Sequence, residues 1–339
     1  MSLPNVAEIS LTKLNYNLNN VKKFTKTAKI CAVVKSDAYG HGIVEIANAL
    51  YNKVDCFAVS LESECVKLRQ AGIDKEILLL TPVFKQNAKR LISLKITLTV
   101  TSPYELKFIY KNAVLLNKRA SVHIKINSGM NRLGIDDVKD VQKCVNYAKR
   151  RGKFIKITGC YSHLGSPSND EYSNHQLEVF KNLSKPVKEY NKNAVLHLSS
   201  SGGILKGKEY LFDMVRVGIL LYGYLPYKTD KIKVKPIMKI KAKRLVNRYN
   251  IKNKHLMYGD NLSVVDGVSV IRLGYADGIF RSNTNGVIGN ACMDLCATNL
   301  TNSSYVTIVS DVEKLAKSYG TISYEVLTNI TKRSQRIYK

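Results

Sequence analysis

The sequence predicts an α/β protein with an N-terminal (β/α)8 barrel followed by a smaller, mostly β C-terminal domain. Short apolar runs alternate eight times with polar, helix-patterned segments over about 225 residues, which matches the strand count and length of a parallel barrel. After Tyr224 this alternation stops, and short apolar runs separated by turn residues follow. The 339 residues can bury one large core and a smaller one. We therefore expect domains at residues 1–228 and 229–339, with the option that the extreme N-terminal strand packs on the second domain.

The apolar runs of the first domain are short and rich in strand-forming residues, as buried parallel strands are. They lie at residues 30–35, 56–60, 76–80, 96–101, 120–127, 154–162, 194–199 and 211–217. The polar segments between them include stretches with helical spacing at residues 43–51, 61–71, 138–151 and 171–190.

The second domain opens with a segment that alternates between lysine and apolar side chains, residues 237–245. A period of two predicts a half-buried strand with one face in water. We expect further strands at residues 263–273, 286–291 and 305–309, because turn residues separate these runs.

The chain is strongly basic, with 53 Lys and Arg against 26 Asp and Glu and a net charge of +27. Such a surface attracts polyanions. The basic residues do not gather into a patch with interleaved aromatic side chains, and no RNA- or DNA-binding motif is present. We interpret the charge as a solvated surface and expect no nucleic-acid partner.

Composition also bears on the compartment and on metals. No apolar run approaches the ~20 residues that cross a bilayer, and the N-terminus MSLPNVAEISL lacks the pattern of a secretion signal. The seven cysteines form no CxxC pair, and the six histidines are not paired with them. We expect a soluble, cytoplasmic protein with reduced thiols, no membrane partner and no metal site.

Several predicted barrel strands end in residues that can carry chemistry, and such ends meet at one face of a barrel. Lys35 is the last residue of the first predicted strand, in AVVKSDAYGHG, and a buried lysine beside another cation can form a Schiff base. The segments HLSSSGG and VRVG offer free backbone N–H groups for a phosphate, and arginine can partner a pyridine nitrogen. These observations support the hypothesis of a phosphate-bearing pyridine cofactor at the barrel mouth.

Five motifs in order, AVVKSDAYGHG, KINSGMNRLG, VRVGILLYG, LGYADG and NACMD, resemble those of the alanine racemases. The resemblance covers residues 6–336. It implies a pyridoxal phosphate (PLP) enzyme with a barrel and a β domain. It also implies a head-to-tail homodimer whose active sites are shared between subunits. The implied reaction converts L-alanine to D-alanine, a peptidoglycan precursor.

The resemblance also implies roles for individual residues. Lys35 and Tyr275 of the partner subunit would be the two catalytic bases, and Arg132 and Met293 would bind the substrate carboxylate. Lys125 matches a lysine that is carbamylated in some members. The implied PLP-binding residues are Lys35, Tyr39, His163, Ser201, Arg216, Gly218 and Ile219.

The chain departs from the usual family pattern at four positions. Ser36 stands where Ala is common, Asn127 where Asp is common, and Ser200 where Asn is common. Lys332 replaces a tyrosine that contacts the phosphate side in some members. These departures bear on the shape of the site rather than on its chemistry.

Three alternatives stay open. A racemase that acts on serine, lysine or arginine would carry similar barrel motifs. A PLP-binding barrel without racemase activity fits less well. GYADG and the second domain argue against a one-domain carrier, and the lack of a Cys-based acid near a decarboxylase-type C-terminal motif argues against a decarboxylase. A basic nucleic-acid-binding protein is disfavoured by the absence of a recognisable motif.

Overall fold

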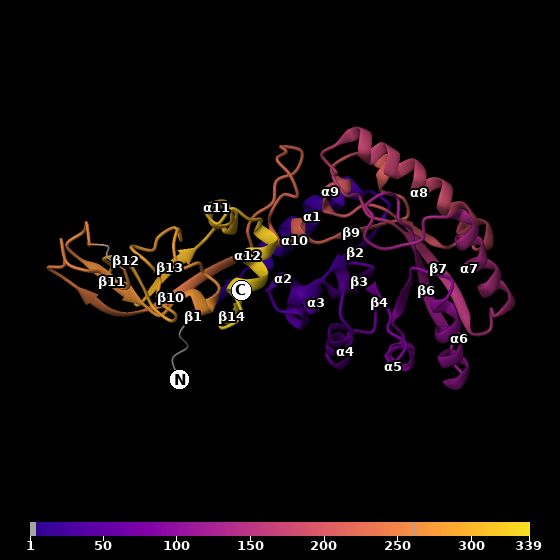
Figure 1. The fold of residues 1–339 in the computed structure, drawn as a ribbon, viewed down its shortest axis with the longest axis horizontal. Coiled ribbons are helices and arrows are strands. Elements are labelled where there is room, and N and C mark those ends of the chain that lie inside the picture. The colour runs from indigo at the N-terminus through magenta and orange to yellow at the C-terminus, as the bar shows by residue number, and fades with distance from the viewer. Residues whose placement is uncertain (1–4, 260–261) are drawn as a thin grey trace.

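The computed structural model describes residues 5–259 and 262–339 as an elongated molecule with two parts (Figure 1). The barrel lies at one end, and a mostly β domain, drawn in orange and yellow, lies at the other. Residues 1–4 of the N-terminal stretch MSLPNVAEISL, for which we predict no secretion signal, lie outside the described residues. The fold class predicted from the sequence is confirmed.

The barrel contains the eight predicted parallel strands, in the spatial order β8-β7-β6-β5-β4-β3-β2-β9. The ring is closed by backbone hydrogen bonds from Asp213 to Leu196 (3.0 Å) and from Arg216 to Ser199 (2.9 Å). The strands are β2 (Lys29–Val33), β3 (Cys56–Val59), β4 (Glu76–Pro82), β5 (Thr97–Val100), β6 (Ala120–Lys125), β7 (Ile155–Tyr161), β8 (Val195–His197) and β9 (Met214–Val217).

The helices of the barrel include all four predicted from helical spacing. In α7 the buried residues Val141, Cys144, Val145 and Ala148 recur every three or four positions, so one face packs on the sheet. The helices are α1 (Leu11–Thr25), α2 (Lys35–Tyr39), α3 (Ile43–Leu50), α4 (Glu62–Gln70), α5 (Ala88–Ser93), α6 (Glu105–Leu115), α7 (Val138–Arg150), α8 (Asp170–Tyr190), α9 (Ser201–Ile204) and α10 (Ile219–Tyr222).

The second domain is built on a sheet of order β12-β11-β10-β1-β14, with β13 also paired to β10. The N-terminal strand β1 pairs with β10 and β14 and so lies in this sheet. The domain boundary at residues 228 and 229 stays a prediction. The elements are β1 (Asn5–Ile9), β10 (Met238–Arg248), β11 (Val268–Ile271), β12 (Cys296–Asn299), β13 (Tyr305–Val309), α11 (Val312–Ser318), α12 (Ser323–Ile330) and β14 (Gln335–Tyr338).

Two strands predicted in this domain differ from those observed. Residues 286–291 form no strand and make one isolated bridge, from Ile288 to Ala297 in β12. Gly286 and Gly289 have φ of 84° and 70°, left-handed values that interrupt an extended run. The strand predicted at 263–273 is reduced to β11, because Ser263 donates to the carbonyl of Val265 (2.8 Å) in a local turn. The strands predicted at 237–245 and 305–309 are confirmed as β10 and β13.

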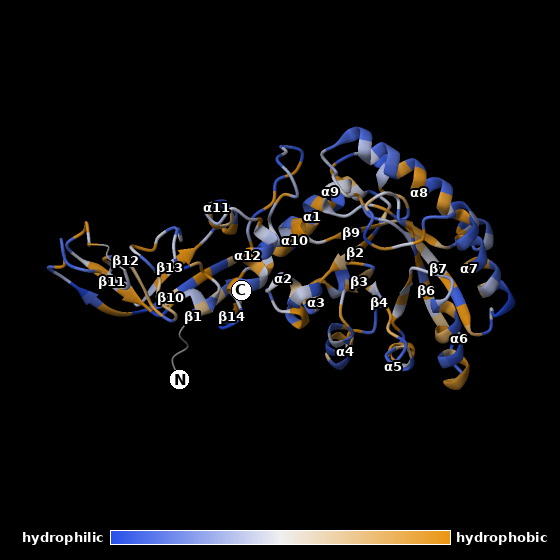
Figure 2. Cartoon of the chain, viewed as in Figure 1, coloured by the Kyte–Doolittle hydropathy of each residue, from blue (hydrophilic) through white to orange (hydrophobic). Residues whose placement is uncertain are grey.

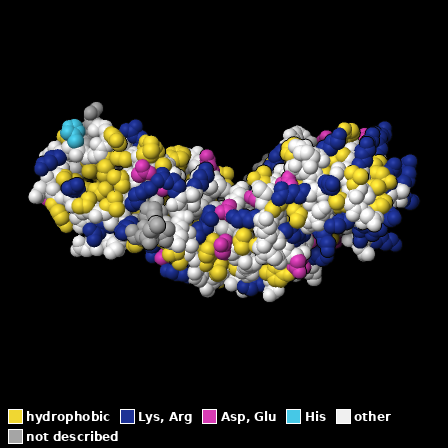
Figure 3. Space-filling model, turned by 90° about the horizontal axis from the view of Figure 1, so that it is seen from below, with side chains coloured by type: hydrophobic (Ala, Val, Ile, Leu, Met, Phe, Trp, Pro, Cys, Tyr) yellow, Lys and Arg dark blue, Asp and Glu magenta, His cyan; other side chains and the backbone are white. Residues whose placement is uncertain are grey.

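The surface reflects the composition. Figure 2 shows hydrophobic residues along the barrel strands and hydrophilic residues on the outer sides of the helices. Lysine and arginine side chains lie across the whole face drawn in Figure 3, most densely at the barrel end. All seven cysteines are free thiols, and only Cys292 is partly exposed. Across residues 5–259 and 262–339, every helix is too short or too polar to cross a membrane.

Candidate active site

Lys35 lies in a left-handed turn at the mouth of the barrel. Strand β2 ends at Val33, so the prediction that Lys35 belongs to the strand is wrong by two residues. Residues 36–39 have φ of 53–54°, which costs an L-residue roughly 1–2 kcal/mol each. The Asp37 carboxylate offsets part of this cost, because it accepts the Ile43 N–H (3.0 Å) and pairs with Arg336 (2.7 Å). Backbone strain of this kind gathers at functional sites.

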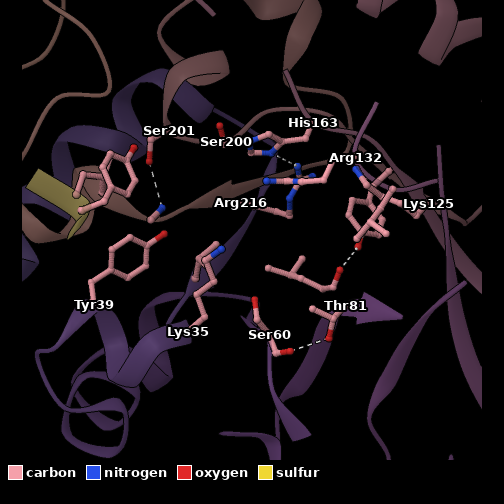
Figure 4. A pocket seen from close by; sticks show the side chains of 17 residues that line it. Lys35, Tyr39, Ser60, Thr81, Lys125, Arg132, His163, Ser200, Ser201 and Arg216 are labelled. Atoms are coloured by element: carbon pink, nitrogen blue, oxygen red, sulfur yellow. Dashed lines mark hydrogen bonds between the residues drawn. The ribbon is translucent and has the colours of Figure 1, made fainter. Parts of the chain in front are cut away.

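A cavity of about 450 Å³ opens above this turn. In Figure 4, Lys35 and Arg216 point into the same space, with Tyr39 and Ser201 on one side and Lys125 and Arg132 on the other. The structure thus gathers all the predicted barrel residues around one cavity. These are Lys35, Tyr39, Lys125, Arg132, His163, Ser201, Arg216, Gly218 and Ile219.

The cavity concentrates positive charge. Burial is the main cause that lowers the pKa of Lys35, and the nearby Arg132 and Arg216 lower it further. Burial also lowers the pKa of Lys125 well below its usual range, and the same two arginines add to the shift. The pKa of His163 falls well below its usual range for the same reasons, so its ring is neutral at pH 7. The described lining includes no aspartate or glutamate.

Arg216 is held by neutral acceptors. Its guanidinium donates to Nδ1 of His197 (2.7 Å) and to the carbonyls of Ser162 (2.6 Å) and Leu198 (3.2 Å). Because arginine can only donate, His197 must accept at Nδ1 and carry its proton on Nε2. That nitrogen lies 2.9 Å from Nδ1 of His123, which must therefore accept. Burial lowers the pKa of His123 to about 4, which keeps this chain of rings neutral.

The opposite end of the cavity is suited to a phosphate. Ser201 Oγ accepts the N–H groups of Gly218 (3.1 Å) and Leu220 (3.4 Å), which joins the starts of α9 and α10. The first N–H groups of a helical turn have no partner within the turn and can bind an anion. A Cβ at position 218 would lie 2.5 Å from the Tyr39 hydroxyl, so only glycine allows this approach.

Tyr275 and Met293 lie outside the cavity of their own chain. Both side chains are exposed, at 42% and 55%. Their loops are joined by backbone bonds from Tyr275 to Cys292 (3.0 Å) and from Ala276 to Met293 (3.0 Å). Asp277 braces the pair by accepting the Gly274 N–H (2.9 Å). Tyr275, the predicted second base, and Met293, the predicted contact of the substrate carboxylate, therefore lie next to each other but not next to Lys35 of the same chain.

Sequence reasoning missed four polar residues that line the cavity: Ser60, Thr81, Tyr161 and Tyr324. Ser60 and Thr81 lie at the ends of β3 and β4, where the reasoning that selected Lys35 could have found them. Tyr324 comes from α12 of the second domain, and nothing in its local sequence marks it. Lys332 is exposed, donates to Asn329 (2.7 Å) and is absent from the described lining.

The comparisons with known proteins agree with this geometry. The sequence profile of the alanine racemase N-terminal domain matches residues 9–226, and that of the C-terminal domain matches residues 237–338. An alanine racemase of Treponema denticola is 33% identical, with 98% of this chain and 97% of that protein covered. The chain belongs to the alanine racemase family. It is thus a racemase of the PLP-dependent isomerases.

The chain is also similar to solved structures of racemases. An alanine racemase of Clostridium difficile superposes with a TM-score of 0.94 at 33% identity, with 100% of this chain and 96% of that one covered. One from Bartonella henselae, with covalently bound pyridoxal phosphate, has a TM-score of 0.87 at 25% identity over both whole chains. A histidine racemase of Leuconostoc mesenteroides shares the fold at 21% identity (TM-score 0.92, 99% and 98% covered). The fold alone therefore does not define the amino acid.

The residues around the cavity fit PLP. Lys35 could supply an amine, Arg216 a fixed guanidinium donor, and the starts of α9 and α10 N–H groups for a phosphate. Arginine is one of the two residue types that partner a pyridine nitrogen in such enzymes, so Arg216 is suited to that role.

One loop departs from the usual pattern and presents Arg132. The Asn127 amide donates to Asp136 (2.5 Å) and Asn131 (3.0 Å), and its oxygen accepts the Asn131 N–H (2.9 Å). An aspartate at position 127 could not donate and would face the Asp136 carboxylate. At position 127, asparagine is therefore better suited than aspartate to a site beside the Asp136 carboxylate.

We expect Asn127→Asp to loosen this loop and to raise KM for the amino-acid substrate about 10-fold, with a smaller change in kcat. The free energy of unfolding should fall by about 0.5–1.5 kcal/mol, the net worth of an ordinary hydrogen bond, because the contact is exposed to solvent. Steady-state kinetics and thermal unfolding measure both effects. Adding Asp136→Asn should restore KM, and a double variant as impaired as the single one would show that this contact does not position Arg132.

Proposed function

We propose that this protein interconverts L- and D-alanine with PLP bound through Lys35, and that it supplies D-alanine for peptidoglycan. The observation that carries the proposal is the set of four basic side chains, Lys35, Lys125, Arg132 and Arg216, around one cavity whose described lining holds no acid. Such a lining attracts anionic groups. A cofactor phosphate at one end and an amino-acid carboxylate at the other would neutralise it.

The residues divide the work by position. Tyr39, Ser201, Gly218 and Ile219 would hold the phosphate. When bound, PLP withdraws electrons from the amino acid joined to it and so acidifies its Cα–H bond. Lys35, with its lowered pKa, is suited to take and return a proton at Cα on one face. Arg132 would bind the substrate carboxylate.

Arg216 favours racemisation over competing reactions. Burial lowers its pKa. The ordinary pKa of arginine is nevertheless so high that the guanidinium stays charged at neutral pH. With PLP bound, Arg216 would donate a hydrogen bond to the ring nitrogen and would keep its own proton. A ring without that proton withdraws electrons less strongly, which disfavours protonation on the cofactor and hence transamination.

The opposite face of Cα needs a second base, and we propose Tyr275 of the partner subunit. Within one chain the tyrosine is exposed and lies away from the cavity, as a residue that completes another subunit's site would. Cationic surroundings favour the deprotonated form of a phenol, and Arg132 would supply a positive charge. The partner's Met293 would add a backbone N–H for the substrate carboxylate.

Lys125 is suited to carbamylation. Burial and the two nearby arginines lower the pKa of its amine well below the usual range, which favours the neutral form that can add CO2. The resulting carbamate would place a negative charge beside Arg132 and Arg216, the two residues that lower its pKa. The cytoplasmic location and the absence of nucleic-acid partners stay predictions.

The function is tested by incubating the PLP-loaded protein with single enantiomers of alanine, serine, lysine, arginine and histidine. Chiral chromatography should show both enantiomers approaching equal amounts, with kcat/KM for alanine at least about 10-fold above the others, which corresponds to 1.4 kcal/mol of transition-state discrimination. Faster conversion of another amino acid would replace alanine as the substrate. Release of an α-keto acid or CO2 at a comparable rate would contradict racemisation.

A further inference from the structure

Glu64 is a buried carboxylate that connects two units of the barrel beside Lys35. It lies in the first turn of α4, the helix that follows β3, and only 8% of its surface is exposed. One carboxylate oxygen accepts the N–H of Ser36 (2.5 Å), the residue after Lys35. The other accepts the N–H groups of Ser60 and Leu61, both at 3.0 Å.

These contacts join both sides of the cavity floor. Ser36 is the first residue with left-handed φ, at the point where the chain leaves Lys35. Ser60 follows β3 and lines the cavity. The carboxylate therefore fixes the start of the strained turn to the end of the adjacent strand, and the Lys35 backbone cannot shift without breaking a bond to Glu64.

Glu64 also has an electrostatic effect on Lys35. The charged groups that act on the Lys35 amine are Arg132 and Arg216, which lower its pKa, and Glu64, which raises it. His163 also faces the lysine, but its ring is neutral. Glu64 thus limits how far burial and the two arginines lower the pKa of Lys35.

We propose that Glu64 is a positioning residue for Lys35, which fixes the backbone of the lysine's turn and supplies the negative charge that balances its amine. The proposal rests on the proposed function, in which Lys35 moves the substrate proton. Glu64 itself neither binds the substrate nor moves a proton in the proposed function.

A purely structural role is the alternative, because a glutamate in the first helical turn commonly caps the helix start. Glu105 shows what that role looks like in the same barrel. In the first turn of α6 it accepts the N–H of Thr101 (2.6 Å) and the Thr101 hydroxyl (2.7 Å). Its described bonds reach no residue of the Lys35 turn. Glu105 is therefore a matched control for capping without positioning.

The test compares Glu64→Gln with Glu105→Gln in the full-length protein. In PLP-free protein, competitive acetylation of Lys35 at a series of pH values, read by mass spectrometry, gives the midpoint at which the amine becomes reactive. Loss of a nearby negative charge disfavours the protonated amine, so Glu64→Gln should lower this midpoint by about one pH unit. Glu105→Gln should leave it unchanged. Identical midpoints in the wild type and both variants would overturn the charge role.

Glu64→Asp separates charge from geometry and serves if the glutamine variant does not accumulate. The shorter side chain keeps the charge but cannot reach both Ser36 and the α4 start. We expect a labelling midpoint near that of the wild type, together with a kcat about 10-fold lower and little change in KM. A wild-type kcat would overturn the positioning role. Because labelling is independent of turnover, a failure of the proposed reaction would be recognised separately.

Discussion

Lys35→Ala is expected to lower kcat/KM for the substrate alanine by at least about three orders of magnitude. The variant lacks both the amine that binds PLP covalently and the base that acts at Cα. Borohydride reduction should attach the cofactor to a peptide containing Lys35 in the wild type and to no peptide in the variant. Steady-state kinetics and peptide mapping measure the two effects.

Unlike activity, the thermal stability of the folded protein should not fall in Lys35→Ala. The folded protein lowers the pKa of Lys35, so the protonated amine opposes folding at any pH below the ordinary lysine pKa. When both proteins are compared free of PLP, its removal should leave the unfolding temperature equal or higher at pH 7. Lys29→Ala is the control, since Lys29 is exposed at the other end of β2, and its activity should change less than about two-fold. A yellow, borohydride-reducible and active Lys35→Ala enzyme would contradict the role of Lys35.

The barrel was predictable because its signals are local. Buried parallel strands are short apolar runs, and their carboxyl ends meet at one face, so Lys35 and Arg216 could be placed together from strand ends. The resemblance then selected Lys125, Arg132 and His163. The structure places all five around one cavity.

The conformation at Lys35 was not predictable from local sequence. Residues 36–39 contain no glycine, yet all adopt left-handed φ. Their conformation depends on distant partners: Glu64 on the backbone of Ser36, and Arg336 on Asp37. Single-sequence patterns carry no information on such contacts.

The second domain shows the same limit. Helix α12 packs against the Lys35 turn, where the Thr331 hydroxyl donates to the carbonyl of Gly40 (2.9 Å). This packing brings Tyr324 into the cavity. The error at residues 286–291 arose because hydrophobic composition outweighed two glycines whose φ is set by the fold. Contacts between domains, rather than propensity, shaped this part of the site.

The separation of Tyr275 from Lys35 within one chain leads to the second large expected effect. Lys35 lies at the mouth of the barrel, whereas Tyr275 lies exposed in the second domain and outside the described cavity lining. In the proposed two-base reaction, a proton leaves one face of Cα and another is added on the opposite face. A two-fold homodimer in which each second domain caps the partner's barrel would bring them together and exclude water.

Lys35→Ala and Tyr275→Phe should each be nearly inactive alone and should complement each other when mixed. Each heterodimer would contain one intact site and one site that lacks both groups. Random reassociation gives about half heterodimers, and hence roughly a quarter of wild-type activity. The mixture is unfolded or dissociated, reassociated, and assayed for racemisation, with heterodimers counted by native mass spectrometry. Lys35→Ala mixed with Arg132→Ala is the matched control, because both residues line the cavity of one chain and no intact site can form. Heterodimers without recovered activity in the first mixture would place Lys35 and Tyr275 in the same subunit's site.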